Sequence, residues 1–216
     1  MSIHQTYAVL GLGKYGRSVA LELTRSGAEV IAVDINEDIV DEVSPKLPIC
    51  RCADITDPEV MVKLGIKNVD VAIVAMANNL EGSVLAVTLL KELGVPTVIA
   101  KCGNEMHMKI LSRVGADRVV FPEKESGTRL GKSLVSSGFT DIIELSPEVS
   151  MLELDMKNEW VNKNLIELSL RKKYSINVVA IRKGDDAVID IDPNMPLDKE
   201  MKLIVIADTK KLNKLK

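Results

Sequence analysis

Three glycines and one aspartate carry the clearest chemistry in this sequence. Gly11, Gly13 and Gly16 fall in the pattern GLGKYG, and Asp34 follows Gly13 by twenty-one residues. Gly11 allows a tight turn, Gly13 lets backbone N–H groups approach a phosphate, and Gly16 lets a helix pack closely on a strand. A carboxylate at Asp34 can accept hydrogen bonds from both hydroxyls of a ribose and disfavours a 2′-phosphate. The spacing therefore predicts a site for an adenosine phosphate and argues against NADP.

The elements around these residues have the order that such a site needs. A short apolar run over 7–10 leads into the glycines, a helical pattern follows over 14–25, and a second apolar run over 29–33 ends at Asp34. The unpaired N–H groups at the start of that helix favour an anion. Strand, glycine turn, helix, strand and acid together form the dinucleotide-binding fingerprint. The fingerprint leaves the nucleotide open, because ATP, ADP and NAD share the adenosine-phosphate portion.

Composition limits the remaining function classes. Apolar residues make up 46% of the 216 residues, which is enough for a folded core. Aromatic residues make up 3% and the net charge is −3 without a basic stripe, so no nucleic-acid partner is expected. The longest apolar run, 71–77, is shorter than a membrane span, and no secretory signal is expected at the N-terminus. Three cysteines fit a reducing compartment better than a disulfide scaffold.

The first part of the chain alternates strands and helices. Strands are expected at 7–10, 29–33, 49–53, 71–75, 97–101 and 118–121. Helices are expected at 14–25, 37–43, 58–64, 80–93, 105–114 and 127–137. This α/β pattern predicts a Rossmann-like, doubly wound parallel sheet as a domain over 1–137. Ligands of such sheets bind beyond the carboxyl ends of the strands, which gives these site candidates: Asp34, Asp54, Ala77, Asn78, Lys101 and Glu123.

The pattern changes near Gly138. The run 136–150 contains turn residues and no helical period, and beyond it the expected strands lie closer together. They are placed at 149–156, 176–182, 187–191 and 203–207, with a short helix at 164–174 and a loop at 192–196. A small α+β C-terminal domain over 138–216 is the prediction. Its size is near the lower limit for an independent core, so we expect it to dimerise.

Two weaker motifs have simpler explanations. The segment 126–133, SGTRLGKS, nearly spells a P-loop, but Ser126 replaces its first glycine and Gly127 leaves one residue too few. That spacing fits the start of the last helix better. Cys50 and Cys52 are two apart on a strand and are interpreted as buried small apolar residues on one face. No metal-ligand spacing and no serine, histidine and acid arrangement is found.

The missing catalytic groups bear on function. An enzyme that transfers hydride needs an acid or base beside the cofactor, and the second domain contains no histidine or cysteine. A protein that reads a nucleotide is therefore favoured over an NAD-dependent oxidoreductase, which stays the alternative. A redox-sensing DNA-binding repressor is disfavoured by the charge and by the lack of a helix-turn-helix.

Five segments spread over both predicted domains carry a family resemblance. They read GLGKYGRSVALEL, VIAVDINEDIV, CADITDPEVM, GADRVVFPEKESG and LIELSLRKKYSINVVAI. The chain resembles the regulator-of-potassium-conductance (RCK) family and, within it, the cytoplasmic gating subunits of bacterial Ktr-type potassium uptake systems. The resemblance implies a cytoplasmic protein that assembles as dimers in a ring, typically an octamer, beneath a membrane subunit that translocates potassium. It also implies that bound ATP, ADP or NAD changes the shape of the ring and gates potassium flow.

The resemblance extends to individual site residues. It assigns nucleotide binding to Gly11, Gly13, Lys14, Tyr15, Gly16, Asp34, Ile35, Asp54, Ala77, Asn78, Lys101 and Arg118. Asp54 is expected near the adenine, and Arg118 is the last residue of the GADR motif. Lys14 departs from the family pattern, since Ktr-type members often carry arginine there. Lysine supplies charge without a planar fork, and Arg17 is an alternative partner for a terminal phosphate.

Two further sites follow from the resemblance. Glu123 matches a glutamate that helps to hold a divalent cation, Mg²⁺ or Ca²⁺, at the dimer interface of the nucleotide site. A solvated surface glutamate is the alternative. The C-terminal segment resembles a pocket for cyclic di-AMP at a dimer interface, with these residues at matching positions: Leu165, Ile166, Arg171, Ile176, Asn177 and Pro193. An apolar dimer seam with one exposed arginine is the alternative there.

Overall fold

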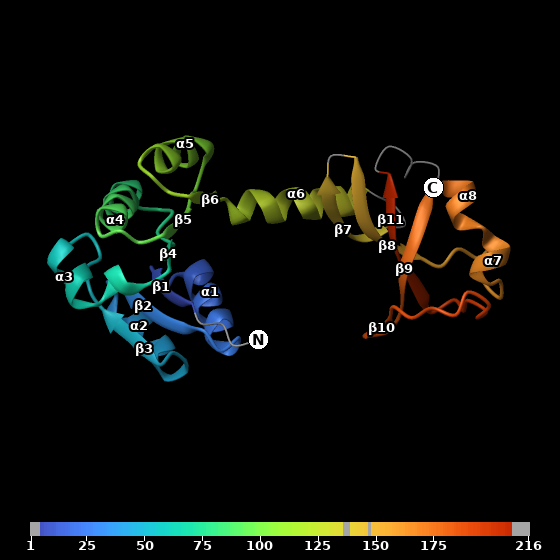
Figure 1. Cartoon of the computed structure of the whole chain (residues 1–216), viewed down its shortest axis with the longest axis horizontal. Helices are drawn as coiled ribbons and strands as arrows, with labels where there is room; N and C mark the ends of the chain where they lie inside the picture. Colours follow the sequence, from blue (N-terminus) through green and yellow to red (C-terminus); the bar gives the residue numbers. More distant parts are fainter. Residues whose placement is uncertain (1–4, 136–138, 147, 209–216) are drawn as a thin grey trace. The chain divides into compact units, whose positions relative to one another are not determined.

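A computed structural model describes residues 5–135, 139–146 and 148–208 of the chain. They form two compact units, Met1–Lys124 and Glu125–Lys216, and the division falls inside helix α6, Pro122–Val135 (Figure 1). The domain boundary predicted between Ser137 and Gly138 lies outside the described residues and stays a prediction. Among the helices of the described ranges, none has both the length and the apolar character needed to cross a membrane.

The first unit is built on a six-stranded parallel sheet of order β3-β2-β1-β4-β5-β6. The strands are β1 (Thr6–Leu10), β2 (Glu29–Asp34), β3 (Ile49–Cys52), β4 (Val71–Val74), β5 (Thr97–Lys101) and β6 (Arg118–Val120). The strand order reverses beside β1, which pairs with β2 on one side and β4 on the other. The predicted doubly wound sheet is confirmed, and β1 lies at the switch point where such folds bind ligands.

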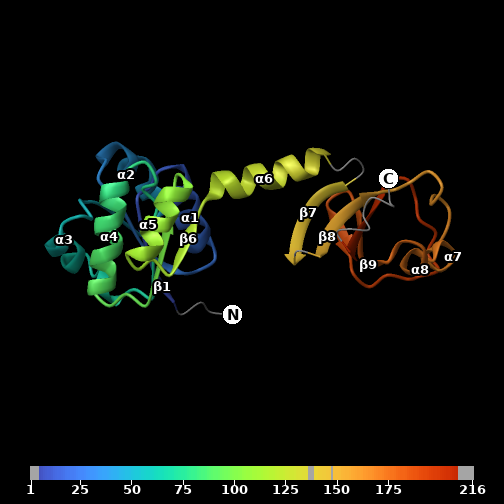
Figure 2. The same ribbon diagram turned by 90° about the horizontal axis from the view of Figure 1, so that it is seen from above.

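Helices cover both faces of this sheet. They are α1 (Lys14–Arg25), α2 (Glu37–Val43), α3 (Pro58–Lys63), α4 (Leu80–Glu92) and α5 (Glu105–Arg113), with 3-10 turns at Ser44–Lys46 and Ile66–Asn68. Helices α4 and α5 lie side by side (Figure 2).

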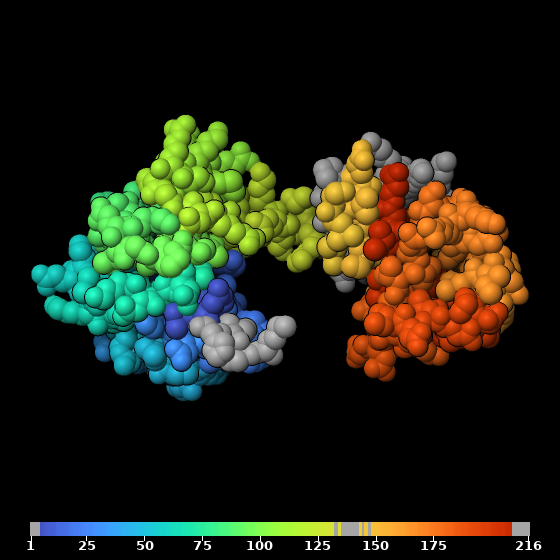
Figure 3. Space-filling view, viewed as in Figure 1, coloured from blue at the N-terminus to red at the C-terminus, as the bar shows by residue number. Residues whose placement is uncertain are grey.

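Strand β1 contributes to two hydrophobic cores. Ala8 and Leu10 pack in one cluster with residues of α3, α4 and α5, whereas Val9 packs in the other with residues of α1 and α2. Successive side chains of a strand point to opposite faces, so a strand covered on both sides must be apolar throughout. In the space-filling view the atoms coloured from blue to green pack as one continuous body (Figure 3).

The second unit contains a five-stranded antiparallel sheet of order β10-β9-β11-β8-β7. Its strands are β7 (Phe139–Ser146), β8 (Val149–Asp155), β9 (Ile176–Lys183), β10 (Asp186–Val188) and β11 (Met201–Asp208). One face packs against Trp160 and against the short helices α7 (Leu165–Leu168) and α8 (Leu170–Tyr174). The predicted α+β class of this part is confirmed.

The second unit also corrects two expectations. Strand β7 lies within the run 136–150, which contains turn residues and where no strand was predicted before Val149. Its register against β8 shifts near Thr140 and Glu144, and these shifts disturb the alternation of a strand. The single helix expected over 164–174 is divided at Ser169, whose φ of 47° lies in the left-handed region. Helical hydrogen bonding cannot continue through that conformation, so two short helices result.

Three smaller corrections concern the start of a helix, the bounds of a strand and the burial of a cysteine. Helix α6 begins at Pro122 rather than at 127, since proline is well suited to the first turn of a helix. It therefore contains the segment 126–133 that resembles a P-loop. This segment is helical, as expected from the sequence, and does not form a phosphate-binding loop between a strand and a helix. Strand β10 covers Asp186–Val188 rather than 187–191. Cys50 is buried but Cys52 is exposed, because it ends the edge strand β3.

Candidate functional site

The glycines after β1 occupy three different environments. Gly11 has φ +96°, and a Cβ there would lie 2.9 Å from the Met76 Cγ. A Cβ on Gly16 would lie 1.9 Å from the carbonyl oxygen of Gly11, so only glycine lets α1 approach the end of β1. A Cβ on Gly13 would meet no protein atom within 4 Å. The protein itself does not require glycine at position 13, whereas a closely bound ligand would.

Helix α1 differs from its neighbours in how it begins. Its N-cap, Gly13, provides no side-chain hydrogen bond, and its first turn contains no acid. Each of α2–α5 begins with an Asn or Asp that accepts a backbone N–H and has at least one acid in its first turn. The N–H groups of α1 and the positive end of its dipole are therefore open to an external anion.

Asp34 lies at the end of β2 and is held against the glycine turn. Its Oδ2 accepts the Leu12 N–H at 2.5 Å, and its Oδ1 accepts the Asn36 N–H at 2.9 Å. Each carboxylate oxygen has a further lone pair, so both can accept additional hydrogen bonds. The orientation of the carboxylate is thus fixed by the backbone before any ribose arrives.

A cavity of about 620 Å³ opens at the carboxyl ends of β1–β5. Its lining includes eleven of the residues proposed for the nucleotide and the cation: Gly11, Gly13, Lys14, Tyr15, Asp34, Ile35, Asp54, Ala77, Asn78, Lys101 and Glu123. Gly16 lies behind the turn, where it makes the close helix approach described above. The residues that were predicted from the carboxyl ends of the strands therefore line one cavity.

Arg118 is placed elsewhere. It is the exposed first residue of β6 and does not line the cavity. Its neighbour Asp117 accepts the Val98 N–H at 2.6 Å and pairs with Lys91 at 3.0 Å. The hydrogen bond from Val98 is the main reason that the pKa of Asp117 is lowered. The acid of the GADR motif thus fixes β5 and α4, and the binding role of Arg118 stays a prediction.

Lys101 is the most enclosed cation of the cavity. Its Nζ lies 2.6 Å from the Glu123 Oε1 and 5.6 Å from the centre of the Tyr15 ring. The side chain of Lys101 is 14% exposed, against 62% for Glu123. The hydrogen bond from Lys101 lowers the pKa of Glu123, so this carboxyl stays ionised at neutral pH.

The other polar groups of the site are arranged unequally. Asp54 accepts hydrogen bonds from the Thr56 hydroxyl at 2.7 Å and from the Thr56 N–H at 2.9 Å, and these bonds lower its pKa. Lys14 is exposed and has no ion-pair partner among the described residues. Arg17 forms a two-bond pair with Glu42 at 2.6 and 2.7 Å. Lys14 is therefore better placed than Arg17 to bind an incoming anion.

Sequence reasoning missed part of the apolar wall. Ile39, Ile55 and Met76 also line the cavity, and such aliphatic side chains suit the faces of a purine. Ile55 and Met76 come two or three residues after a strand end. Extending the carboxyl-end rule by two or three residues beyond each strand would have found both.

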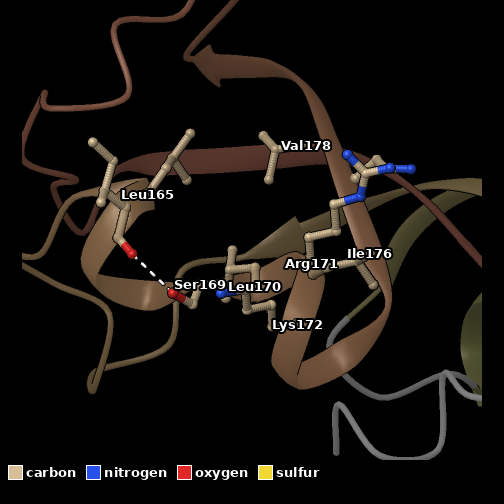
Figure 4. A pocket seen from close by; sticks show the side chains of 9 residues that line it. Leu165, Ser169, Leu170, Arg171, Lys172, Ile176 and Val178 are labelled. Atoms are coloured by element: carbon tan, nitrogen blue, oxygen red, sulfur yellow. Dashed lines mark hydrogen bonds between the residues drawn. The ribbon is translucent and has the colours of Figure 1, made fainter.

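The second unit contains a smaller cavity, of about 380 Å³, formed by α7, α8 and β9 (Figure 4). Its lining includes five of the six residues proposed for cyclic di-AMP: Leu165, Ile166, Arg171, Ile176 and Asn177. Pro193 does not line it. Ser169 donates a hydrogen bond to the Ile166 carbonyl at 3.0 Å, which fixes the break between the two helices. Ile166 is 58% exposed, so this cavity has an open apolar wall.

Comparison with known proteins agrees with this architecture. The chain belongs to the family defined by the TrkA-N domain, which matches residues 7–122, followed by the TrkA-C domain, which matches residues 149–216. It is 38% identical to Ktr system potassium uptake protein C of Bacillus subtilis over 93% of this chain and 90% of that protein. It is 36% identical to Ktr system potassium uptake protein A of the same organism, over 96% and 93%.

Solved structures show the same fold. The GsuK channel matches with a TM-score of 0.69 at 15% identity, over 98% of this chain and 38% of that one. The GsuK channel bound to NAD matches with a TM-score of 0.64 at 15% identity, over 96% and 38%. The predicted RCK family membership is confirmed. Because the relatives are potassium uptake proteins rather than oxidoreductases, the comparisons decide against the enzyme alternative.

Proposed function

We propose that this chain is the nucleotide-sensing regulatory subunit of a membrane potassium uptake system. The observation that carries the proposal is the coincidence of Ktr-protein similarity along nearly the whole chain with one cavity that joins an uncapped helix terminus to Asp34. The subunit works in the cytoplasm and reaches the membrane through the potassium-translocating subunit that it gates. No nucleic-acid partner is involved.

The proposed ligand of the larger cavity is ATP or ADP, with NAD as the second candidate. Phosphates would meet the α1 terminus and Lys14, the ribose would meet Asp34, and the adenine would lie by Asp54 and Ile55. NAD stays a candidate because a GsuK channel of similar fold has been solved with NAD. ADP is supported in the same way by another GsuK structure, bound to ADP, which matches at a TM-score of 0.50. Only the adenosine-phosphate portion is common to all three.

Gating would follow from differential binding. A ligand shifts a conformational equilibrium only by the difference in its affinity for the two states. ATP carries one more phosphate than ADP, so the two can favour different geometries of paired sites in a dimer. In a ring of such dimers, proposed to be octameric, that difference would become a change of ring shape that the membrane subunit follows.

A divalent cation, Mg²⁺ or Ca²⁺, is proposed at Glu123. Among the described residues no group of three potential metal ligands is found in one chain, and Glu123 is paired with Lys101. Additional oxygen ligands would therefore have to come from the phosphates or from Glu123 of a second copy. Oxygen ligands of this kind suit both ions, and the cation would offset the repulsion between facing polyphosphates.

Cyclic di-AMP is the ligand proposed for the smaller cavity. Arg171 from each of two copies would pair with a phosphate, Asn177 would bind an adenine edge, and Ile166 and Ile176 would contact its faces. The open apolar wall around Ile166 supports the proposal, because a second copy would complete the enclosure. Pro193 would contribute only from outside the cavity of a single chain.

Calorimetry with ATP, ADP and NAD tests the proposed function. Wild-type protein should bind at least one of them, and Asp34→Ala should abolish that binding. Asp41→Asn is the matched control, since Asp41 is an exposed acid on α2 that does not line the cavity. Equal affinities in wild type and Asp34→Ala, or no binding by wild type, would contradict the proposal.

A further inference from the structure

The charge of the larger cavity poses a problem for a phosphate ligand. Two lysines, Lys14 and Lys101, face three carboxylates, those of Asp34, Asp54 and Glu123. The positive end of α1 attracts a phosphate, but side chains with more anionic than cationic groups oppose a polyphosphate unless a cation becomes available close to it. Lys101 is the less exposed of the two lysines, and its charge is already balanced by the Glu123 carboxylate at 2.6 Å.

Glu123 is also an anchor of helix α6. It is the second residue of that helix, and its ion pair with Lys101 links the first turn of α6 to the end of β5. The next residue, Lys124, pairs with Glu105 in the first turn of α5 at 2.5 Å. Among the described residues, these two ion pairs hold the same turn, one in the cavity lining and one outside it.

We propose that Lys101 exchanges partners when a phosphate enters the larger cavity, leaving Glu123 for a phosphate oxygen and so releasing one of these two ion pairs of α6. This inference rests on the proposed nucleotide binding and deepens it, because it names the contact through which occupancy reaches α6. The exchange moves no proton and breaks no covalent bond.

The geometry favours such an exchange over a rigid ion pair. Lys101 has a flexible four-carbon stem, and its ammonium is close enough to the Tyr15 ring for a cation–π contact that a shift toward the glycine turn need not break. A terminal phosphate carries more negative charge than the Glu123 carboxylate and attracts the ammonium more strongly. Linkage makes the effect reciprocal, so Glu123 must weaken phosphate binding as much as phosphate weakens the Lys101–Glu123 pair.

Calorimetry on the full chain in EDTA tests the exchange without interference from divalent cations. ADP is the probe, adenosine is the control without phosphate, and Glu123→Gln removes the competing carboxylate while keeping the shape of the side chain. Glu123→Gln should bind ADP about threefold to tenfold more tightly than wild type, while its affinity for adenosine stays the same. Glu105→Gln breaks the other anchor of the same turn and should change neither affinity.

A second variant separates charge from folding. Lys101→Gln should weaken ADP binding, and adding Glu123→Gln to it should have no further effect, since no ammonium is left to release. Glu123→Gln with unchanged or weaker ADP binding would overturn the exchange while leaving the proposed function intact. A wild type that binds neither ADP nor adenosine would overturn both.

Amide hydrogen exchange tests the consequence for α6. ADP should raise the exchange of amides 126–130 in wild type, adenosine should not, and Glu123→Gln should show the raised level without ligand. Protection of these amides by ADP would overturn the proposed release.

Discussion

The two cavities of this protein are built in opposite ways. The larger one lies at the carboxyl ends of parallel strands, where backbone N–H groups and residues from five strand ends converge. The smaller one is formed by two short helices that a single left-handed residue, Ser169, separates, and by one strand. The first site follows from the topology of a whole sheet, whereas the second depends on one local conformation. Sequence reasoning is accordingly stronger for the first.

Gly16→Ala should cause the largest loss of stability, and only the first unit should lose it. Its Cβ would lie 1.9 Å from the Gly11 carbonyl oxygen, so helix or strand must move, and the free energy of unfolding should fall by roughly 3 kcal/mol. Urea unfolding followed by circular dichroism measures the loss.

The single tryptophan, Trp160, is buried in the second unit and reports that unit alone. In Gly16→Ala its fluorescence transition should stay where it is in wild type. Equal shifts of both signals would show that the two units unfold together, and the contrast between them would be lost.

Arg171→Ala should separate the two cavities by ligand. Losing a charge-assisted hydrogen bond to a phosphate should weaken cyclic di-AMP binding by about 1.5 kcal/mol, or roughly tenfold, and leave ADP affinity unchanged. Lys173→Ala is the control, because Lys173 is an exposed cation of the same helix that does not line the cavity. A parallel loss of ADP binding in the calorimeter would mean that the sites are not independent.

Gly13→Ala should affect binding without affecting stability. A methyl group there meets no protein atom within 4 Å but would stand where a phosphate approaches, so ADP affinity should fall about tenfold. The urea midpoint should stay within the error of the wild-type value. If ADP binds this variant as tightly as wild type, the phosphate is not at the glycine turn.

The smallest expected effect concerns Asp117 and pH. Its pKa is lowered in the folded chain from 3.8, so the unfolded chain binds more protons in acid. The stabilisation is present above the unfolded pKa and is lost as pH falls through the folded pKa. In Asp117→Asn the free energy of unfolding should fall less on acidification than in wild type, by about 0.5–1 kcal/mol, and ADP affinity should stay unchanged. Urea midpoints between pH 2 and pH 6 measure it, and an altered affinity would refute the structural role.

The fold could be predicted where one pattern repeats. Apolar strands and amphipathic helices alternate up to β6, and the end of each strand is marked by a turn or a polar residue. The sheet and most of the cavity lining could therefore be predicted from the sequence. Strand β7 could not be predicted because its register shifts hide its alternation. The break at Ser169 has no signal in the sequence, since serine is tolerated inside helices and rarely adopts a positive φ.

Contacts within the site were harder to predict than its location. The predicted order of parallel strands placed Asp34 and Lys101 at the same edge of the sheet, but nothing in it showed that Lys101 would pair with Glu123 or that Asp54 would bind Thr56. Such pairings depend on side-chain rotamers set by packing from several elements. Arg118 was named from a motif alone, and it is the first residue of its strand both as predicted and as observed, so it lies away from the carboxyl ends that form the cavity.

The central claim is that an adenosine phosphate in the larger cavity changes the shape of an assembly of these chains. Small-angle X-ray scattering of the purified protein with ATP, with ADP and with adenosine tests it most directly. The account predicts an oligomer whose scattering curve differs between ATP and ADP and returns to the ligand-free form with Asp34→Ala. A monomer whose curve is the same under all three conditions would contradict it.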